Sequence, residues 1–180
     1  MQSDFSRVLL RREEIGKRVA ELAAEIDRDY AGKNPLFVGI LKGSVFFFTD
    51  LLQQLHIPAQ LDFMSVSSYG NGDQTSGRVR IMKDLDRPIE GQHVVIVEDI
   101  IDSGTTLSYL KRLLESRNPA SVRICTLLDK PDRRRTKVAV DYRGFVIPDE
   151  FIVGYGLDYA ERYRLEPDIY VLDPHVYGKE

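Results

Sequence analysis

The sequence predicts an α/β protein with a central parallel sheet flanked by helices. Short apolar runs alternate along the chain with segments whose apolar residues recur at helical spacing, which is the pattern of repeated βα units. The run 93–99, HVVIVED, is continuously apolar before its two acids and suits a central parallel strand covered on both faces. A loop, a helical segment and another apolar run follow it, which completes a βαβ unit with an expected right-handed crossover.

Length and composition narrow the class of protein. The 180 residues fit one domain, 1–180, without a visible linker, and 43% hydrophobic with 29% charged residues excludes a disordered chain. The formal net charge of -3 provides no general attraction for nucleic acid or an anionic membrane. No apolar run approaches the roughly 20 residues of a membrane span, and the N-terminus lacks the apolar core of a signal peptide. We expect a cytoplasmic protein without nucleic-acid or membrane partners. The lone Cys125 excludes an internal disulfide.

The first half of the chain predicts a helix, a strand, a second helix and a second strand. The apolar residues of 11–30 share one helical face, and 31–35 end that helix. Residues 36–41 predict a buried strand, followed by a Lys-Gly-Ser turn and a helix over 45–55. Residues 59–68 alternate as an imperfect strand that leads into a loop rich in Gly, Asn and Asp. The expected buried positions of the first helix are Ile15, Val19, Leu22, Ala23, Ile26 and Tyr30.

The second half predicts more strands and one more helix. Residues 79–85 suit a further strand, and the central run 93–99 is followed by DSGTT and a helical segment over 107–115. After Pro119, the run 121–130 predicts the next strand. Two short apolar runs, FIVGY and IYVLD, close the chain.

The segment 94–106, VVIVEDIIDSGTT, carries the chemistry. In an open parallel sheet ligands bind beyond the carboxyl ends of the strands, and this strand delivers two acids, Glu98 and Asp99, to that edge. The following DSGTT offers backbone N–H groups and hydroxyls at a helix N-terminus, which suits a phosphate. It is not a Walker A loop, because the chain has no GxxxxGK[ST]. The alternative is that Asp102 and Ser103 only cap the helix and that the two acids are solvated.

This segment resembles the phosphoribosyl diphosphate motif of the type I phosphoribosyltransferases. Further segments follow the order and spacing of hypoxanthine-guanine members of that family: LKGS at 41–44, Ser68-Tyr69, LDK at 128–130 and FIVGYGLDY at 151–159. The resemblance implies the type I phosphoribosyltransferase fold, with a small hood formed by the chain termini. It also implies purine salvage by transfer of a 5-phosphoribosyl group to hypoxanthine, and to guanine, with release of diphosphate and with magnesium required. A homo-oligomer, dimer or tetramer, is expected, and the apolar residues 45–48 suit its interface.

The resemblance assigns roles to the residues of the motif. Glu98 and Asp99 would hold the ribose hydroxyls, and Asp102 would exchange a proton with the attacking ring nitrogen. The 5-phosphate would be bound by the DSGTT loop, and diphosphate by Lys42, Gly43 and Arg164, with a cis peptide between Leu41 and Lys42. The phosphate-binding residues are Asp102, Ser103, Gly104, Thr105 and Thr106.

The resemblance also assigns the base, metal and lid residues. Lys130 would donate to the exocyclic oxygen of the purine, Phe151 would stack on its ring, and the backbone of Ile152 would meet its pyrimidine edge. Asp158, with Glu98 and Asp99, would help to hold Mg²⁺, which arrives with its phosphate substrate. Ser68 and Tyr69 would begin a lid over the site. The alternatives are a solvated Lys130 and a core Phe151.

Two other functions compete with this prediction. The first is a regulator that keeps the phosphoribosyl diphosphate pocket as a sensor and binds DNA or RNA; the basic run 133–137 would support it, although a solvated loop explains that run better. The second is transfer to adenine, uracil or orotate, against which Lys130 and FIVGYGLDY argue. His56, His93 and His175 match no motif position and are expected to be structural or surface residues.

Overall fold

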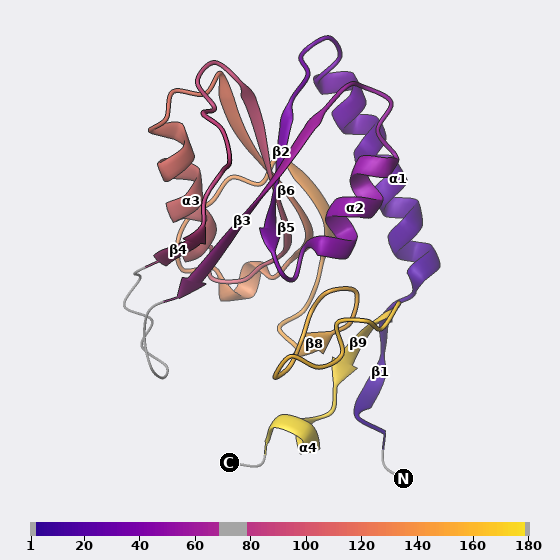
Figure 1. Cartoon of the computed structure of the whole chain (residues 1–180). Helices are drawn as coiled ribbons and strands as arrows, with labels where there is room; N and C mark the ends of the chain where they lie inside the picture. Colours follow the sequence, from indigo (N-terminus) through magenta and orange to yellow (C-terminus); the bar gives the residue numbers. More distant parts are fainter. Residues whose placement is uncertain (1–2, 69–78, 179–180) are drawn as a thin grey trace.

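The computed structural model describes residues 3–68 and 79–178 and contains two sheets. Figure 1 shows the larger sheet with helices on both faces and the smaller sheet below it, where both chain ends lie. This arrangement confirms the predicted fold class, including the hood formed by the chain termini. In chain order the elements are β1 Phe5–Leu10, α1 Arg12–Asp29, β2 Leu36–Leu41, α2 Val45–Gln53, β3 Gln60–Ser68, β4 Val79–Lys83, β5 His93–Ile101, α3 Thr105–Glu115, β6 Ser121–Asp129, the 3₁₀ turn η1 Pro131–Arg133, β7 Tyr142–Val146, β8 Ile152–Val153, β9 Ile169–Leu172 and α4 Pro174–Tyr177.

The larger sheet has the strand order β4-β3-β2-β5-β6-β7. All its neighbouring strands are parallel except β4, which pairs antiparallel with β3 at the edge. The expectation of a parallel sheet is therefore wrong for β4. Only the ten residues 69–78 separate β3 from β4, whereas a crossover to a parallel strand needs roughly a dozen or more.

Both faces of the larger sheet are covered, as the continuous apolar runs predict. One hydrophobic cluster joins Phe37, Val95 and Val97 to α1 and α2, and the other joins Val38 and Ile96 to α3. Neighbouring residues of one strand thus serve opposite faces. The predicted apolar face is confirmed, since its six residues, five in α1 and Tyr30 at the C-cap of that helix, are each at most 2% exposed.

The smaller sheet, the hood, has the order β1-β9-β8 with antiparallel pairs. The two apolar runs at the end of the chain contribute β8 and β9 here and not to the parallel sheet. Strands β1 and β7 and helix α4 were not predicted from the sequence. Strand β1 pairs with β9, so that Phe5 faces Leu172 from the other end of the chain.

The apolar residues 45–48 are not the free surface that the sequence suggested. Phe47 and Phe48 lie in the core of this chain at 0% and 1% exposure, and only Val45 and Phe46 remain partly exposed. Among the helices of the described ranges, none is long and apolar enough to cross a membrane.

Candidate active site

The site begins where β2 and β5 end side by side. From these neighbours the chain proceeds to opposite sides of the sheet, to β3 and to β6, and such a switch point opens a crevice at the carboxyl edge. Here Lys42-Gly43 meets Glu98-Asp99: a Cβ atom on Gly43 would collide with the Asp99 carboxylate. The Leu41–Lys42 peptide is cis, as the resemblance implies.

Glu98 and Asp99 form a coupled carboxylate pair. Burial, and then the charge of Asp99, holds the pKa of Glu98 well above its usual range; burial also raises the pKa of Asp99. Backbone N–H groups donate to both carboxylates, from Ile100 to Asp99 Oδ1 at 2.7 Å and from Asp99 to Glu98 Oε1 at 3.0 Å. Both residues are half-buried and hold these backbone bonds, so the alternative of freely solvated strand-end acids is wrong. A cation or hydroxyl donors bound at the pair would favour the ionised form of both carboxyl groups.

The loop after β5 encloses a cavity of about 180 Å³. Gly104 adopts φ +81 at the turn into α3, where a Cβ would also press against the Thr136 carbonyl. Gly104 is the N-cap of α3 and Asp102 makes no cap bond, so the helix-cap alternative is wrong for Asp102. Ser103 does bond to the start of the helix, because its Oγ accepts the Thr105 N–H at 3.3 Å. The cavity is lined by Glu98, Asp99, Ile100, Ile101, Asp102, Ser103, Gly104, Thr106 and Leu107.

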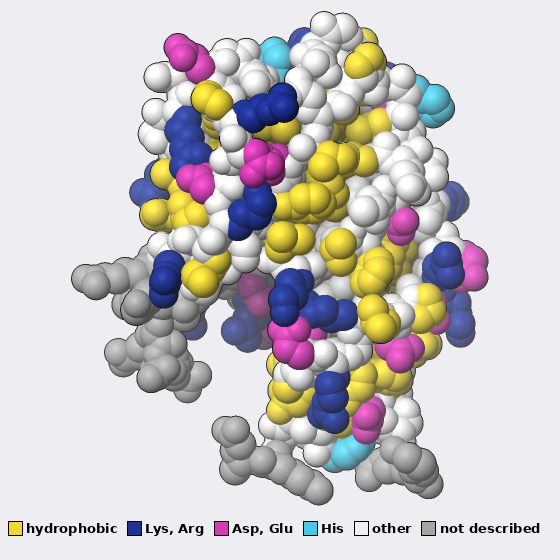
Figure 2. Space-filling view, in the orientation of Figure 1, with side chains coloured by type: hydrophobic (Ala, Val, Ile, Leu, Met, Phe, Trp, Pro, Cys, Tyr) yellow, Lys and Arg dark blue, Asp and Glu magenta, His cyan; other side chains and the backbone are white. Residues whose placement is uncertain are grey.

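A second, larger cavity of about 390 Å³ adjoins the first. Ile100 and Asp102 line both cavities, so Asp102 stands at their junction. Figure 2 shows a recess between the body and the hood, with acidic and basic side chains gathered around it. The second cavity is lined by Ile100, Asp102, Lys130, Arg133, Asp149, Glu150, Phe151, Ile152, Leu157, Asp158 and Tyr177.

The second cavity combines an aromatic wall with a nearly buried cation. Lys130 is 7% exposed and its Nζ donates to the Glu150 carbonyl oxygen at 2.6 Å, so the solvated alternative is wrong. Phe151 is 37% exposed and is not a core residue. Its ring stacks on Tyr177 with centroids 4.9 Å apart, which leaves an aromatic surface at the cavity. This arrangement suits a flat, apolar ring that carries a hydrogen-bond acceptor.

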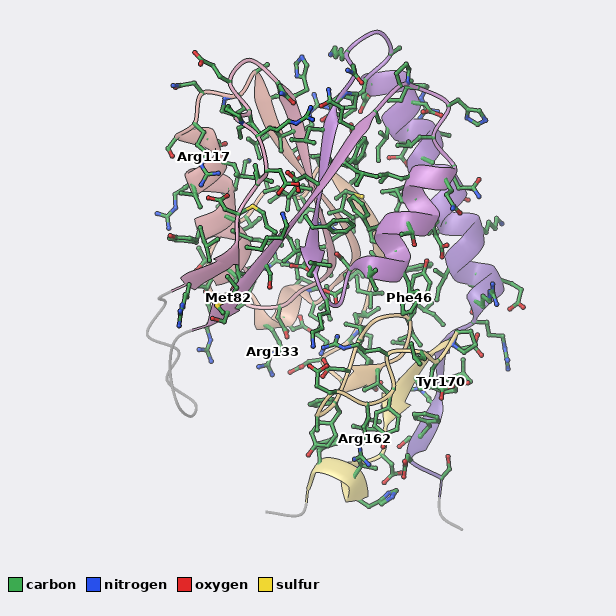
Figure 3. All side chains as sticks on the ribbon, in the orientation of Figure 1. Phe46, Met82, Arg117, Arg133, Arg162 and Tyr170 are labelled. Carbon is green, nitrogen blue, oxygen red and sulfur yellow. The ribbon has the colours of Figure 1, made fainter. Side chains whose placement is uncertain are left out.

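The basic run 133–137 supports the phosphate loop. Arg133 Nε lies 3.2 Å from Asp102 Oδ1, and Figure 3 shows Arg133 at the boundary between the larger sheet and the hood. Arg134 pairs with the buried Asp129 and donates from Nε to the Asp102 carbonyl oxygen at 3.2 Å. Two further backbone N–H groups of the run, at Arg135 and Thr136, donate to the Ser103 carbonyl. The solvated-loop interpretation is therefore wrong for Arg134.

The hood adds Asp158 and Arg164. Arg164 Nη2 lies 3.2 Å from Asp158 Oδ1, and Nη1 donates to the Gly156 carbonyl at 2.7 Å. Within the described part of the chain, Arg164 Nε is buried without a hydrogen-bond partner, which suits a donor that binds an external anion. A Cβ on Gly156 would collide with the Gly43 carbonyl, so this hood loop packs directly on the Lys42-Gly43 turn.

The predicted lid residues and the three histidines lie outside the two cavities or outside the residues that the structure describes. Ser68 ends β3, whereas Tyr69 and the rest of the proposed lid lie in 69–78, which the structure does not describe. The three histidines lie apart from both cavities, as expected; their partners are Asp27, Ser121 and Asp173.

Several residues of the second cavity were not predicted from the sequence: Arg133, Asp149, Glu150, Leu157 and Tyr177. Arg133 follows Lys130 by one turn of η1, a spacing that could have indicated a shared site. No sequence pattern indicated Tyr177, because its position at the cavity depends on how α4 packs against Phe151.

Comparison with known proteins places this geometry in a family. The model of the phosphoribosyl transferase domain matches residues 8–160. The hypoxanthine-guanine phosphoribosyltransferase of Bacillus subtilis is 51% identical over 177 residues, which cover 98% of each chain. A hypoxanthine phosphoribosyltransferase crystal structure from Staphylococcus aureus has a TM-score of 0.94 at 49% identity, covering 97% of this chain and 95% of that chain. The bifunctional protein TilS/HprT of Listeria monocytogenes is 51% identical over 99% of this chain, which spans 28% of that relative's length.

Proposed function

The chain belongs to the phosphoribosyltransferase family, among its hypoxanthine-guanine members, and we propose that it is a purine-salvage enzyme that transfers the 5-phosphoribosyl group from phosphoribosyl diphosphate to hypoxanthine and guanine. The bond between the ribose anomeric carbon and diphosphate breaks, a bond from the purine nitrogen to that carbon forms, and the nitrogen loses its proton. The observation that carries this proposal is Asp102 at the junction of a phosphate-sized cavity and a purine-sized one.

Asp102 takes the proton of the attacking nitrogen and returns it in the reverse reaction. The first cavity binds the 5-phosphate through the N–H groups and hydroxyls of 102–106 at the start of α3. Glu98 and Asp99 accept hydrogen bonds from the two ribose hydroxyls. Their charge also favours the positive charge that develops on the ribose as diphosphate departs.

The second cavity binds the base. Phe151 stacks on the purine and Lys130 donates to its exocyclic oxygen, while the backbone of Ile152 meets the pyrimidine edge. Support comes from the stacked Phe151 and Tyr177 rings and from Lys130 Nζ, whose carbonyl partner at Glu150 uses only one of its three protons.

The acids of the site fit magnesium that is delivered by the substrate. Across the residues that the structure describes, no group of three or more metal-ligating side chains exists, so the protein alone offers no closed metal cage. Mg²⁺ usually takes one or two carboxylates and completes its shell with water and phosphate oxygens. Asp158 and the Glu98-Asp99 pair supply hard oxygen donors of this kind. Magnesium bound there would neutralise the charge of the departing diphosphate.

One assay tests the proposed function. The purified chain is given phosphoribosyl diphosphate, Mg²⁺ and, separately, hypoxanthine, guanine, xanthine and adenine, and the nucleotide and diphosphate products are quantified. We expect turnover with the six-oxopurines and little with adenine. Turnover restricted to adenine, or binding of phosphoribosyl diphosphate without any transfer, would contradict the proposal, and the second result would favour a sensor.

We further propose one domain over 1–180, a cytoplasmic location and a homo-oligomer. Figure 2 shows hydrophobic side chains gathered over β3 and α2, where Leu61 is 59% exposed. Such a patch suits a second copy of the chain. Sedimentation velocity would test this, because a monomer at micromolar concentration would contradict it.

Lys130→Met should narrow the preference for hypoxanthine over adenine. The ammonium can donate to a carbonyl oxygen but offers no acceptor to the amino group of adenine. Losing a hydrogen bond from a charged donor costs ~1.5–3 kcal/mol, so kcat/KM for hypoxanthine should fall roughly 10- to 150-fold while that for adenine changes little. Lys137→Met, an exposed lysine of the following loop, is the control. If the ratio of kcat/KM for hypoxanthine to kcat/KM for adenine stays unchanged, another group selects hypoxanthine over adenine.

Arg134→Gln should weaken phosphate binding without weakening base binding. Arg134 holds the Asp102 carbonyl against Asp129, so its loss loosens the phosphate loop but not the aromatic wall. One charge-assisted hydrogen bond suggests about a 10-fold rise in KM for phosphoribosyl diphosphate. Arg135→Gln changes an exposed neighbour and is the control. Equal rises in KM for both substrates would indicate a general structural defect.

A further inference from the structure

Glu161 lies between the two cations that the proposed function assigns to diphosphate. Its Oε2 is 3.2 Å from Lys42 Nζ, and its Oε1 is 3.1 Å from Arg164 Nη2. Lys42 follows β2 in the larger sheet, whereas Arg164 belongs to the hood, so Glu161 connects the two parts of the molecule across the site. One carboxylate thus occupies both cations in the same way that one phosphate group would.

The backbone of the hood loop holds Glu161 in this place. Ala160 and Glu161 adopt φ +49 and +62, in the left-handed region that non-glycine residues seldom occupy. The turn is closed by a bridge between Tyr159 and Arg162, and the Glu161 N–H donates to Asp158 Oδ2 at 2.9 Å. A backbone conformation of this kind persists only where its surroundings impose it, and such places are often functional.

The contacts of Glu161 are suited to exchange. Both contacts of Glu161 are ion pairs between its carboxylate and a side-chain cation. Yet the side chains of Lys42 and Glu161 are 69% and 64% exposed, and water and salt weaken ion pairs of this kind. A diphosphate carries more charge than a carboxylate and would displace it.

We propose that Glu161 is an internal anion of the diphosphate subsite, and this inference rests on the proposed function. In the free enzyme Glu161 keeps Lys42 and Arg164 facing the subsite; substrate diphosphate displaces it; and it competes with product diphosphate for the same two cations. The carboxylate therefore lowers the affinity for diphosphate and favours release of that product.

The test is the affinity for inorganic diphosphate in the presence of Mg²⁺, measured by titration calorimetry on the full chain. Glu161→Gln removes the competing charge and should tighten binding about 2- to 10-fold, which corresponds to two exposed ion pairs. Glu161→Asp keeps the charge and should fall closer to the parent. Glu166→Gln is the control, because it removes a hood carboxylate that makes no contact with Lys42 or Arg164 among the described residues. A misfolded variant would bind more weakly, so tighter binding cannot come from damage.

Two further variants separate this inference from the proposed function. Lys42→Met and Arg164→Gln should each weaken diphosphate binding if these cations form the subsite. If neither weakens it, the assignment of the subsite itself fails. If both weaken it while Glu161→Gln binds diphosphate no more tightly than the parent, the assignment stands and the role of Glu161 is overturned.

Discussion

We expect Asp102→Asn to lower the rate of phosphoribosyl transfer to hypoxanthine by about 10²- to 10⁴-fold, which is the usual contribution of a positioned general base. An amide keeps the shape and the neighbours of Asp102 but cannot take the proton of the purine nitrogen. Since the same group returns that proton in the reverse direction, the breakdown of the nucleotide by diphosphate should slow by a similar factor. Single-turnover measurements are required, because slow product release in the parent would hide part of the effect.

The control for this result is Asp132→Asn, which makes the same change at an exposed acid of η1. The Kd for phosphoribosyl diphosphate should remain within a few-fold of the parent for both variants. A parent-like single-turnover rate in Asp102→Asn would assign proton transfer to another group. Asp149, another acid that lines the second cavity, would then be the first group to examine.

Removing both acids of the pair, Glu98→Ala with Asp99→Ala, should weaken binding of phosphoribosyl diphosphate and slow the chemical step together. Each hydrogen bond to a charged group contributes ~1.5–3 kcal/mol, so the two suggest a loss of about 10²- to 10⁴-fold in kcat/KM for this substrate. The contributions of adjacent residues are seldom additive, so the measured loss in kcat/KM belongs to the two acids together and not to either one. The measurement is a full kinetic analysis at saturating Mg²⁺, with hypoxanthine held constant.

The amide variant, Glu98→Gln with Asp99→Asn, separates charge from hydrogen bonding. It keeps acceptors for the ribose hydroxyls but removes the negative charge, so binding should recover more than the rate does. Recovery of the rate to the parent level would show that the charge of the pair does not assist the reaction. Unchanged affinity and rate in the alanine variant would remove the assignment of the ribose site altogether.

The sequence was most informative where burial dictates the residue pattern. Strands β2 and β5 are continuously apolar because α1 and α2 cover one face and α3 the other, and both were predicted close to their observed bounds. Strand β1, whose first five residues are exposed or half-exposed, is defined by its pairing with β9 and carries no such pattern. Its partner is distant in sequence, so no local window contains the information.

In the candidate site too, the residues that a local segment places could be predicted, whereas those that distant contacts place could not. The residues of 98–106 lie together because one strand and one turn place them, and a motif can record that arrangement. Tyr177 reaches Phe151 only after α4 folds back against the hood, and Arg134 reaches Asp102 only through the pairing of β5 with β6. Such contacts arise from tertiary structure, which a linear pattern does not encode.

The pairing of β1 with β9 also affects how the chain matures on the ribosome. Strand β1 leaves the exit tunnel well before its partner, which is synthesised roughly 160 residues later, or about 10 to 30 s at 5–20 residues per second. During that interval β1 has unpaired N–H and C=O groups that could pair with other nascent chains. The six strands of the larger sheet end at Val146 and can assemble before β9 exists. The aromatic wall of the second cavity, which includes Tyr177 and rests on β8 and β9, therefore forms after the larger sheet, and a chain that stalls before α4 would carry a folded phosphate loop without a complete place for the base.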